Sequence, residues 1–355
     1  MTRSTCVALL ITGALTLPAR DARAQSAVLT LPDLSQHARV GQRIGLTDIT
    51  IDYHRPLVRG RKIFGGVQAY GEVWRAGAND NTTIHFSDPV TIEGKPLPKG
   101  TYGLHFIPGP SSWVAIFSNN STSWGSFTYD EKEDALRVAV SPRPIEMLEA
   151  LRYQFDDPTD RSCAVTMQWE RVSVSFTVAV NTPEIVARSL RDQLRGRIQT
   201  EWQPWEEAAN YLIENRLDAE EAVRYANQSV SIEDRFENEI TRARALANAG
   251  RRDEARGAEQ KALTLGSERQ VYDFARSLQR LGQHEQALAI LRRNVEKYPD
   301  GWLADVERAR IAVGGRDYPA AVTAMRAAVK AAPPAMGPAL ADLARQLESG
   351  IDINK

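Results

Sequence analysis

The character of the sequence changes abruptly near Asn181, and this change constrains the fold more than any other feature. Glycine, proline, threonine and valine dominate before it, whereas the helix-favouring residues alanine, arginine, leucine and glutamate dominate after it. The stretch just before the change, Val172–Val180, alternates apolar and polar residues as in a strand with one dry face. The sequence therefore predicts a β region followed by an all-α region.

Short alternating stretches recur throughout the first region and are separated by turn signals that contain glycine or proline. Gly100–Ile107, for example, places Tyr102, Leu104 and Phe106 on one face of a strand. Because no helical stretch intervenes to carry a parallel crossover, we expect antiparallel pairing. The predicted fold class is an α+β multidomain chain, with an antiparallel, jelly-roll-like β-sandwich ahead of an all-α helical-repeat domain.

The second region repeats itself every 32 or 33 residues. Three segments have a glycine followed five residues later by an alanine, and a fourth has the alanine without the glycine. The alanines are Ala222, Ala255, Ala287 and Ala320, and small residues follow seven places later at Ser229, Ala262 and Ala327. Small residues at this spacing are typical of paired helices that cross closely and stack on their neighbours. The pattern resembles degenerate tetratricopeptide repeats, three or four in number.

The first 24 residues have the layout of a secretory signal peptide. Arg3 supplies the positive charge, Val7–Leu17 is an apolar run, and Ala22–Ala24 is a small-x-small cleavage site. The apolar run is too short to span a bilayer, which takes about 20 residues of helix. We expect cleavage near Ala24 and a periplasmic or secreted protein; a buried N-terminal helix is the alternative.

Six segments make up the predicted organisation. They are a signal peptide (1–24), a linker (25–39), a β-sandwich domain (40–181), a linking helix (182–200), tetratricopeptide-like repeats (201–335), and a C-terminal helix and tail (336–355). Cleavage removes three arginines and one aspartate, so that 44 basic and 45 acidic residues become 41 and 44. Without a basic excess or a second long apolar stretch, we expect neither nucleic-acid binding nor a membrane span.

The sequence contains none of the common signatures of phosphate-binding loops, dinucleotide sites, zinc proteases or serine hydrolases. His85 and His105 both fall on the polar face of expected strands, but no third ligand has diagnostic spacing. We therefore predict no metal and no cofactor. Cys163, the only cysteine left after cleavage, fits a buried and inert thiol.

The stretch Tyr53–Asn79 concentrates cations, aromatic residues and glycines. Its cations can converge at one mouth of the β-sandwich and hold an anionic group, because guanidinium forms bidentate bonds to carboxylate or phosphate. In the alternative they bracket tight turns and pair with nearby acids. We favour the alternative for Arg61 and leave both open for the others. The candidate ligand-binding residues are Arg55, Lys62, Trp74 as a pocket wall, Arg75, Asn79, Tyr129 and Asp130.

A second cluster of aromatic residues and glycine spans Trp124–Asp130. In one interpretation Tyr129 and Asp130 face the same mouth as the first cluster. In the other, Trp124 and Phe127 plug one end of the sandwich, as large aromatic residues usually do.

These motifs together resemble a known family. They are Tyr53-x-Arg-Pro, Gly60-Arg-Lys-Ile-Phe-Gly-Gly, Val73-Trp-Arg-x-Gly-Ala-Asn79, Thr82-Thr-Ile, Leu97-Pro-x-Gly-Thr-Tyr102, Ile107-Pro, Trp124-Gly-x-Phe-x-Tyr-Asp130 and Leu136-Arg-Val. In this order they resemble an exported bacterial family catalogued as "domain of unknown function 2911", whose members often carry trailing tetratricopeptide-like repeats. The resemblance covers residues 35–180 and implies that both clusters are the family's hallmark. The family has no established activity, so no catalytic residue is carried over.

Repeats and an arginine-rich loop without a catalytic signature favour an exported, non-enzymatic binding or scaffold protein. The β-sandwich would hold a small anionic or sugar-like ligand, or a partner segment, at its 53–79 face. The repeats would offer a concave surface to a protein or peptide. One alternative is a hydrolase or lyase acting on envelope carbohydrate or ester, with Asp130 or Glu72 as acid or base, assisted by Arg55 and Tyr129. The other is a purely structural β domain that supports the repeats.

Overall fold

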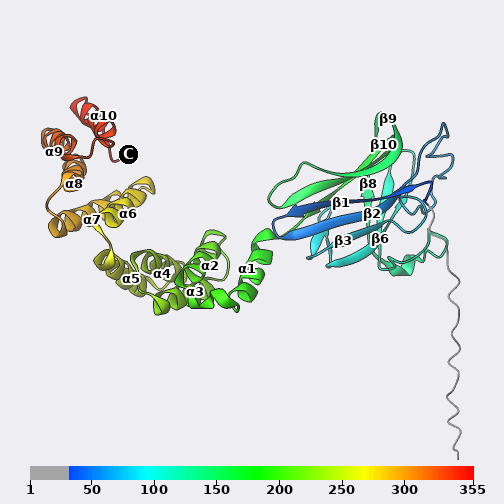
Figure 1. Ribbon diagram of the computed structural model, residues 1–355, viewed down its shortest axis with the longest axis horizontal. Coiled ribbons are helices and arrows are strands. Elements are labelled where there is room, and N and C mark those ends of the chain that lie inside the picture. Colours follow the sequence, from blue (N-terminus) through cyan, green and yellow to red (C-terminus); the bar gives the residue numbers. More distant parts are fainter. Residues whose placement is uncertain (1–31) are drawn as a thin grey trace, which may run out of the picture.

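The computed structural model describes residues 32–355. The predicted signal peptide and the first part of the predicted linker lie outside these residues. Figure 1 shows a β region at one end of the molecule and a succession of helices leading away from it. No helix in the described part of the chain is long and apolar enough to cross a membrane.

Ten strands in the described residues form two antiparallel sheets, which confirms the prediction of an antiparallel β region ahead of an all-α region. The larger sheet has the order β1-β2-β3-β6-β7-β8 and the smaller one the order β5-β4-β10-β9. The strands are β1 (Gln36–Ile44), β2 (Thr47–Arg55), β3 (Thr83–Phe86), β4 (Val90–Ile92), β5 (Lys95–Leu97), β6 (Gly100–Ile107), β7 (Trp113–Ser118), β8 (Asp134–Val140), β9 (Pro142–Asp156) and β10 (Ser162–Ala179).

Two strand boundaries differ from the expectation. β1 begins at Gln36, inside the segment expected to be a linker. The sequence did not reveal this start, because β1 is an exposed edge strand with little apolar alternation. Pro142 and Pro144, whose residue type counts as a turn signal in the sequence, lie within β9. β9 is also an edge strand, where the missing N–H of proline is tolerated.

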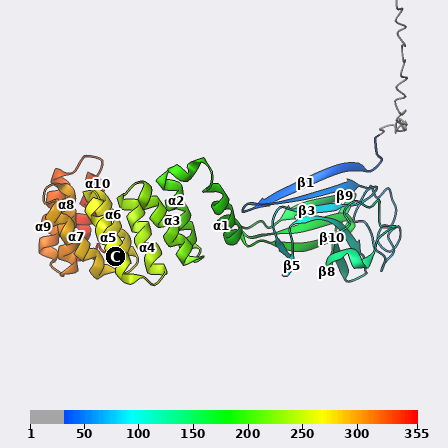
Figure 2. The same ribbon diagram turned by 90° about the horizontal axis from the view of Figure 1, so that it is seen from below.

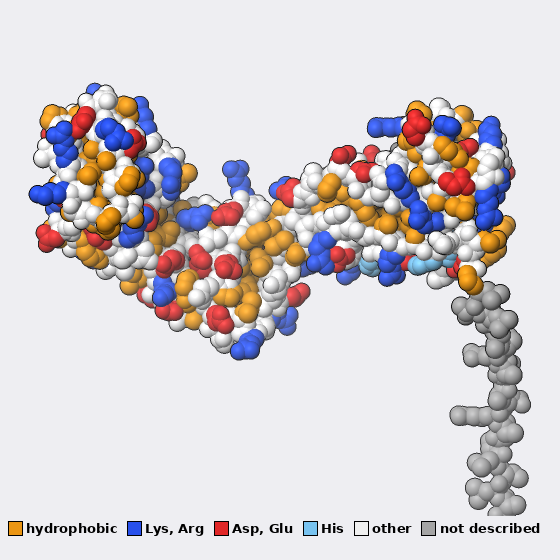
Figure 3. Space-filling model, turned by 45° about the horizontal axis from the view of Figure 1, so that its top comes forward, with side chains coloured by type: hydrophobic (Ala, Val, Ile, Leu, Met, Phe, Trp, Pro, Cys, Tyr) orange, Lys and Arg blue, Asp and Glu red, His pale blue; other side chains and the backbone are white. Residues whose placement is uncertain are grey.

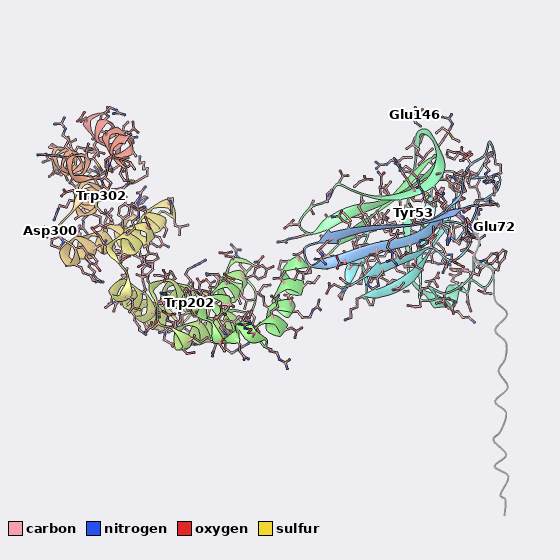
Figure 4. The ribbon with its side chains drawn as sticks, viewed as in Figure 1. Tyr53, Glu72, Glu146, Trp202, Asp300 and Trp302 are labelled. Atoms are coloured by element: carbon pink, nitrogen blue, oxygen red, sulfur yellow. The ribbon has the colours of Figure 1, made fainter. Side chains whose placement is uncertain are left out.

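The β9–β10 ribbon doubles back on itself. Thr166 and Ser175 of β10 are hydrogen-bonded through their hydroxyls at 2.9 Å, although nine residues of extended strand would span about 30 Å. The bend lies near Glu170, which has φ +56° and marks an irregularity in the pairing with β9. Glu146 lies at the tip of this ribbon (Figure 4).

One apolar core fills the β region and takes side chains from both sheets. Phe117 of β7 meets Phe176 of β10 edge to face at 5.3 Å, and Tyr53 of β2 meets Tyr153 of β9 at 4.8 Å. Cys163 is part of this core, and burial raises the pKa of its thiol to about 11, as expected of an inert cysteine.

Helix α1 (Thr182–Gln193) is attached to both halves of the molecule. Its Ile185 belongs to the core of the β region, and Arg188 donates to Asp88 at 2.9 Å. On the other side, Arg191 pairs with Glu221 of the third helix at 2.6 Å. One helix therefore carries both the apolar and the ionic contacts of the junction.

The helical region consists of four helix pairs followed by one further helix, and Figure 2 shows the helices stacked side by side. Two short 3-10 helices also occur: η1 (Glu131–Glu133) precedes β8, and η2 (Arg197–Thr200) joins α1 to α2. The helices of the region are α2 (Trp202–Glu214), α3 (Ala219–Ile232), α4 (Phe236–Asn248), α5 (Arg252–Leu265), α6 (Glu268–Arg280), α7 (His284–Lys297), α8 (Trp302–Gly314), α9 (Tyr318–Ala331) and α10 (Gly337–Glu348). These are the tetratricopeptide-like repeats that the sequence predicted. Figure 3 shows that the stack curves, so that one side is hollowed and bears several Lys and Arg side chains.

The last repeat is shifted by one residue from the predicted register. Ala321 and Ala328 are fully buried, whereas Ala320 and Ala327 are exposed. The cause lies in the turn before α9, where Arg316 rather than Gly315 adopts the left-handed conformation, with φ +59°. A turn that ends one residue later rotates the following helix by one position.

Apolar side chains of the helical region form three separate clusters instead of one core. The first joins α1 to α5, the second is centred on α6 and α7, and the third joins α8 to α10. The segment after α10 turns back onto the stack, where Ile353 joins the third cluster. This segmentation follows from repeats that each contact only their neighbours.

Candidate ligand face of the β region

The long loop between β2 and β3 is organised around Trp74. Its backbone N–H donates to the Phe106 carbonyl at 2.8 Å, and the backbone N–H of Phe106 donates to the Trp74 carbonyl at 2.9 Å. The indole stacks on Trp169 with centroids 5.7 Å apart, and only 3% of the residue is exposed. The prediction of Trp74 as a pocket wall is therefore wrong. Pairing of the loop with β6 turns the ring into the core, where a large apolar surface is most stable.

Arg75, the next residue, faces the loop that precedes β8. It donates from Nη1 to the Asn79 carbonyl at 2.7 Å. Its guanidinium lies 5.4 Å from the Trp124 ring and 5.8 Å from the Phe127 ring, in reach of cation–π attraction. Burial lowers the pKa of Arg75 below its ordinary value, with Asp80 opposing that effect. The structure thus joins the two clusters that the sequence singled out.

Trp124 and Phe127 do not plug the end of the β region. Trp124 is 62% and Phe127 79% exposed, and their rings stack 5.8 Å apart with planes 15° from parallel. Gly125 lets this loop close over Arg75, since a Cβ there would approach Arg75 Nη1 to 2.6 Å. We call Arg75, Trp124 and Phe127 the aromatic–arginine face.

The loop carrying these rings lies over the outer side of the larger sheet. Asn81 donates from Nδ2 to the Asn120 carbonyl, and Asn120 donates from Nδ2 to Glu133, both at 3.1 Å. Gly103 of β6 permits this approach, because a Cβ would come within 2.4 Å of the Asn120 carbonyl oxygen. The cover leaves the Asn81 Oδ1 atom buried without a hydrogen-bond partner in the described residues.

His105 is buried under this loop, with 2% of its surface exposed. Its Nδ1 lies 3.2 Å from Ser126 Oγ, and its ring lies 5.5 Å from that of Tyr129. Burial lowers the pKa of His105 to about 4, with the charge of Asp134 opposing the shift, so the imidazole is neutral at pH 7. Strand alternation assigned His105 to the outer side of its strand, but gave no sign of the loop that covers it.

Tyr129 and Asp130 are occupied by local structure. The Tyr129 hydroxyl donates to Asp134 at 2.6 Å and accepts a hydrogen bond from Arg137. Burial, followed by the bond to Asp134, raises the pKa of Tyr129 to about 12. The exposed Asp130 caps η1 by accepting the N–H of Lys132. Neither residue presents a free functional group to the aromatic–arginine face.

Arg55 and Lys62 are not brought to this face. Arg55 donates from Nε to the Leu151 carbonyl of β9 at 2.9 Å, and Lys62 lies in an exposed turn. Arg61 donates from Nε to the Val58 carbonyl at 3.0 Å, which confirms its structural role. The predicted convergence of the cations is therefore corrected: Arg55 is bonded to β9, Arg61 to its own turn, and Lys62 points from an exposed turn. Arg75 and Asn79 remain from the predicted set.

The sequence analysis did not name four residues of this site as candidates: Asn81, Ser126, Asp134 and Arg137. Each makes its defining contact with a residue on another element or across a loop. The one available signal was the aromatic cluster at Trp124–Asp130, which marked the place but not its partners.

The described residues contain no group of three or more His, Cys, Asp or Glu side chains placed to hold a metal. His85 is exposed, with Nδ1 2.9 Å from the hydroxyl of Thr101. His85 of β3 pairs with Thr101 of β6, and His105 lies four residues beyond Thr101 on β6. The two histidines therefore do not meet.

Comparison with known families accounts for the first half of the chain. Residues 35–178 match the family model described as "Protein of unknown function (DUF2911)", which includes both halves of the aromatic–arginine face. This matched region is called the DUF2911 domain below. The resemblance seen in the ordered motifs is thereby confirmed. No curated protein matches the chain.

Solved structures resemble this chain only in part. The APC/C hetero-tetramer Cut9-Hcn1 is 20% identical, with a TM-score of 0.27, over 42% of this chain and 28% of that chain. MamA is 14% identical, with a TM-score of 0.29, over 42% and 88% of the two chains. YrrB, titled a TPR protein with an unusual peptide-binding site, is 17% identical, with a TM-score of 0.26, over 47% and 87%. At these identities the likeness concerns the fold alone.

Proposed function

We propose that this chain is an exported binding scaffold. Its DUF2911 domain holds a small anionic or sugar-like ligand at the aromatic–arginine face, and its helical region contacts a protein or peptide. The observation that carries the ligand proposal is the exposed Trp124–Phe127 pair stacked around Arg75. Large exposed aromatic residues in contact mark binding surfaces far more often than isolated ones do.

The chemistry of the face narrows the ligand class. Arg75 has no ion pair in the described residues, and its guanidinium is partly buried. Such a group favours a carboxylate or phosphate. The flat faces of Trp124 and Phe127 favour the apolar face of a ring. An acidic sugar combines both features and is our first choice of ligand.

The helical region supplies the scaffold part of the proposal. Four stacked pairs create a long, curved surface that a single pair does not have (Figure 1). This part rests on fold-level analogy, and it gains a specific chemistry only from the residues discussed in the next subsection.

A thermal-shift panel tests the ligand proposal. Wild-type protein would be screened against inorganic anions, neutral sugars, acidic sugars and short peptides. A ligand that raises Tm should lose its effect in Arg75→Ala and in Trp124→Ala. Arg43→Ala is the matched control, because Arg43 is an exposed arginine of the same domain, paired with Asp48 at 2.7 Å. Identical profiles for all four proteins would remove the aromatic–arginine face from the function.

The enzyme alternative gains no support from its named residues. Asp130 caps η1, and Glu72 is exposed at the end of the β region remote from α1 (Figure 4). The Tyr129 hydroxyl already donates a hydrogen bond to Asp134. An acid–base pair poised around a common ligand position is therefore not assembled from these groups.

Export is proposed from residues 1–24, which lie outside the described part of the chain. N-terminal sequencing of protein recovered from the exported fraction should begin at Gln25. Leu10→Arg interrupts the apolar run and should retain the uncleaved chain inside the cell. Unchanged cleavage and location of this variant would contradict the proposal.

A further inference from the structure

The arginines of α6 and α8 fall into two groups. Arg269 and Arg308 are each paired with an aspartate of the same helix, at 2.8 and 2.7 Å. Arg276 and Arg310 form no ion pair with any carboxylate of residues 32–355. Two cations that are buried or partly buried thus occur on these helices without a counter-charge. The fifth arginine, Arg280, also has no ion pair in the described residues, but it is exposed.

These two arginines lie close together and partly out of water. Arg310 is only 4% exposed, donates from Nε to the Tyr272 hydroxyl at 3.1 Å and lies 5.9 Å from that ring. Arg276 bonds to Gln279, and its pKa is lowered by burial and then by the positive charge of Arg310. Burying like charges without an anion is costly, which marks the site as incomplete.

Donors at this place remain unused. Within the described chain, Nε and Nη2 of Arg276 and Nη2 of Arg310 make no hydrogen bond. The residue Gln279 is 2% exposed, and its buried Nε2 also has no partner. Guanidinium and amide donors side by side, all without acceptors, match the oxygens of a carboxylate.

The chain's own 351–354 segment, which includes a turn at residues 353–354, already packs on this surface. Arg310 donates from Nη1 to the Ile353 carbonyl at 2.5 Å, and Asn354 donates from Nδ2 to the Arg310 carbonyl at 2.8 Å. The Ile353 side chain is 5% exposed and packs in the third apolar cluster. Both the main chain and an apolar side chain of a peptide therefore find contacts here.

We propose that Tyr272, Arg276, Gln279 and Arg310, called here the arginine face, bind an acidic peptide segment of a partner protein. An aspartate or glutamate carboxylate of the partner lies between the guanidiniums of Arg276 and Arg310, beside the chain's own 351–354 segment. This inference rests on the proposed function, because it specifies the partner chemistry of the helical region. The chain as a whole has a net charge of −1, so it does not attract acidic peptides in general.

Fluorescence anisotropy with labelled hexaglutamate tests the proposal on the full chain, with hexaglutamine as the uncharged probe. Wild type should bind hexaglutamate, and binding should weaken as salt rises. Arg276→Gln should weaken it about tenfold or more through loss of charge-assisted bonds. Arg276→Lys should fall between the two, because lysine keeps the charge but not the planar fork.

Arg308→Gln and Arg326→Gln are the matched controls, since they remove arginines of α8 and α9 that are paired with Asp305 and Glu348, respectively. Both should bind hexaglutamate like wild type. Arg276→Gln should also keep or raise Tm, because it removes a like charge next to Arg310. Absence of hexaglutamate binding, equal binding of both probes, or equal losses in the control variants would overturn the proposal. Each of these results leaves the thermal-shift test of the DUF2911 domain unaffected.

Discussion

The DUF2911 domain and the helical region bury their apolar side chains in different ways. The first has one core shared by two sheets, whereas the second has three clusters strung along the stack. A single core couples every strand to every other, but stacked repeats couple only neighbours. We therefore expect the first to lose structure as a whole and the second to lose it piece by piece.

The two regions also bury ionisable groups of opposite kinds. His105 is 2% exposed in the DUF2911 domain, and Glu307 is fully buried in α8. Burial favours the neutral form of both, which lowers the pKa of the base and raises the pKa of the acid. The same physical cause thus makes one region sensitive to acid and the other to alkali.

The largest expected effect concerns the single core. Trp169 is 2% exposed and contacts both Trp74 and Phe64. Trp169→Ala should lower the free energy of unfolding of the DUF2911 domain by about 3–5 kcal/mol. Hydrogen exchange read by mass spectrometry should show faster exchange in both sheets and unchanged exchange in α4 to α10. Loss of protection confined to β10 would contradict a shared core.

His105 should make the DUF2911 domain sensitive to acid. Its folded pKa of about 4 lies below the ordinary 6.5, so the unfolded state takes up the proton first. Stability is full above pH 6.5 and falls by about 3 kcal/mol as the pH drops towards 4. Urea unfolding between pH 7 and 4 should show a flatter profile for His105→Gln. His85→Gln, which alters an exposed histidine of the neighbouring strand, should keep the wild-type slope.

Glu307 should make the helical region respond in the opposite direction. Burial raises its folded pKa to about 7, with the hydrogen bond from Asn294 opposing and the charge of Glu268 adding to the shift. Stability is full below pH 4.5 and falls by about 3 kcal/mol as the pH rises to 7 and above. Protection of α6 to α8 against hydrogen exchange should therefore decrease as the pH rises, after correction for the intrinsic pH dependence of exchange. This decrease should be absent in Glu307→Gln. Glu296→Gln, which alters an exposed glutamate, is the control and should keep the pH dependence of wild type. If Glu307→Gln keeps it as well, a group other than Glu307 causes the pH dependence.

The smallest expected effect concerns the junction of the two regions. Arg191 is half exposed, but its partner Glu221 is 6% exposed and also accepts a hydrogen bond from Tyr225. Arg191→Ala should cost about 1 kcal/mol after allowance for solvent screening. The loss should appear as faster exchange in α1 and α3, whereas Arg188→Ala, on the β side of α1, should affect α1 without α3. Equal acceleration of exchange in α3 by both variants would contradict the assignment of Arg191 to the contact with the helical region and of Arg188 to the contact with the DUF2911 domain.

Much of the fold was predictable because its signals are local. Strand alternation identified Gly100–Ile107 to the residue, and the alanine spacing identified the stacked helix pairs. The register of the last pair was not predictable, because Gly315 is the natural left-handed residue and Arg316 takes that role instead. The bend of β10 near Glu170 likewise depends on a contact between residues nine positions apart.

The candidate sites show the limit most clearly. Trp74 is followed by Arg75, and Trp124 is followed by Gly125. Yet Trp74 is in the core, whereas Trp124 is 62% exposed. The sequence by itself determined the two classes of structure, the repeat and the stretches in which unusual residues gather. Only the tertiary structure decided which ring meets Arg75 and which arginines lack a carboxylate. Periodicity and propensity act over a few residues, whereas burial and charge pairing depend on elements that are distant in the chain.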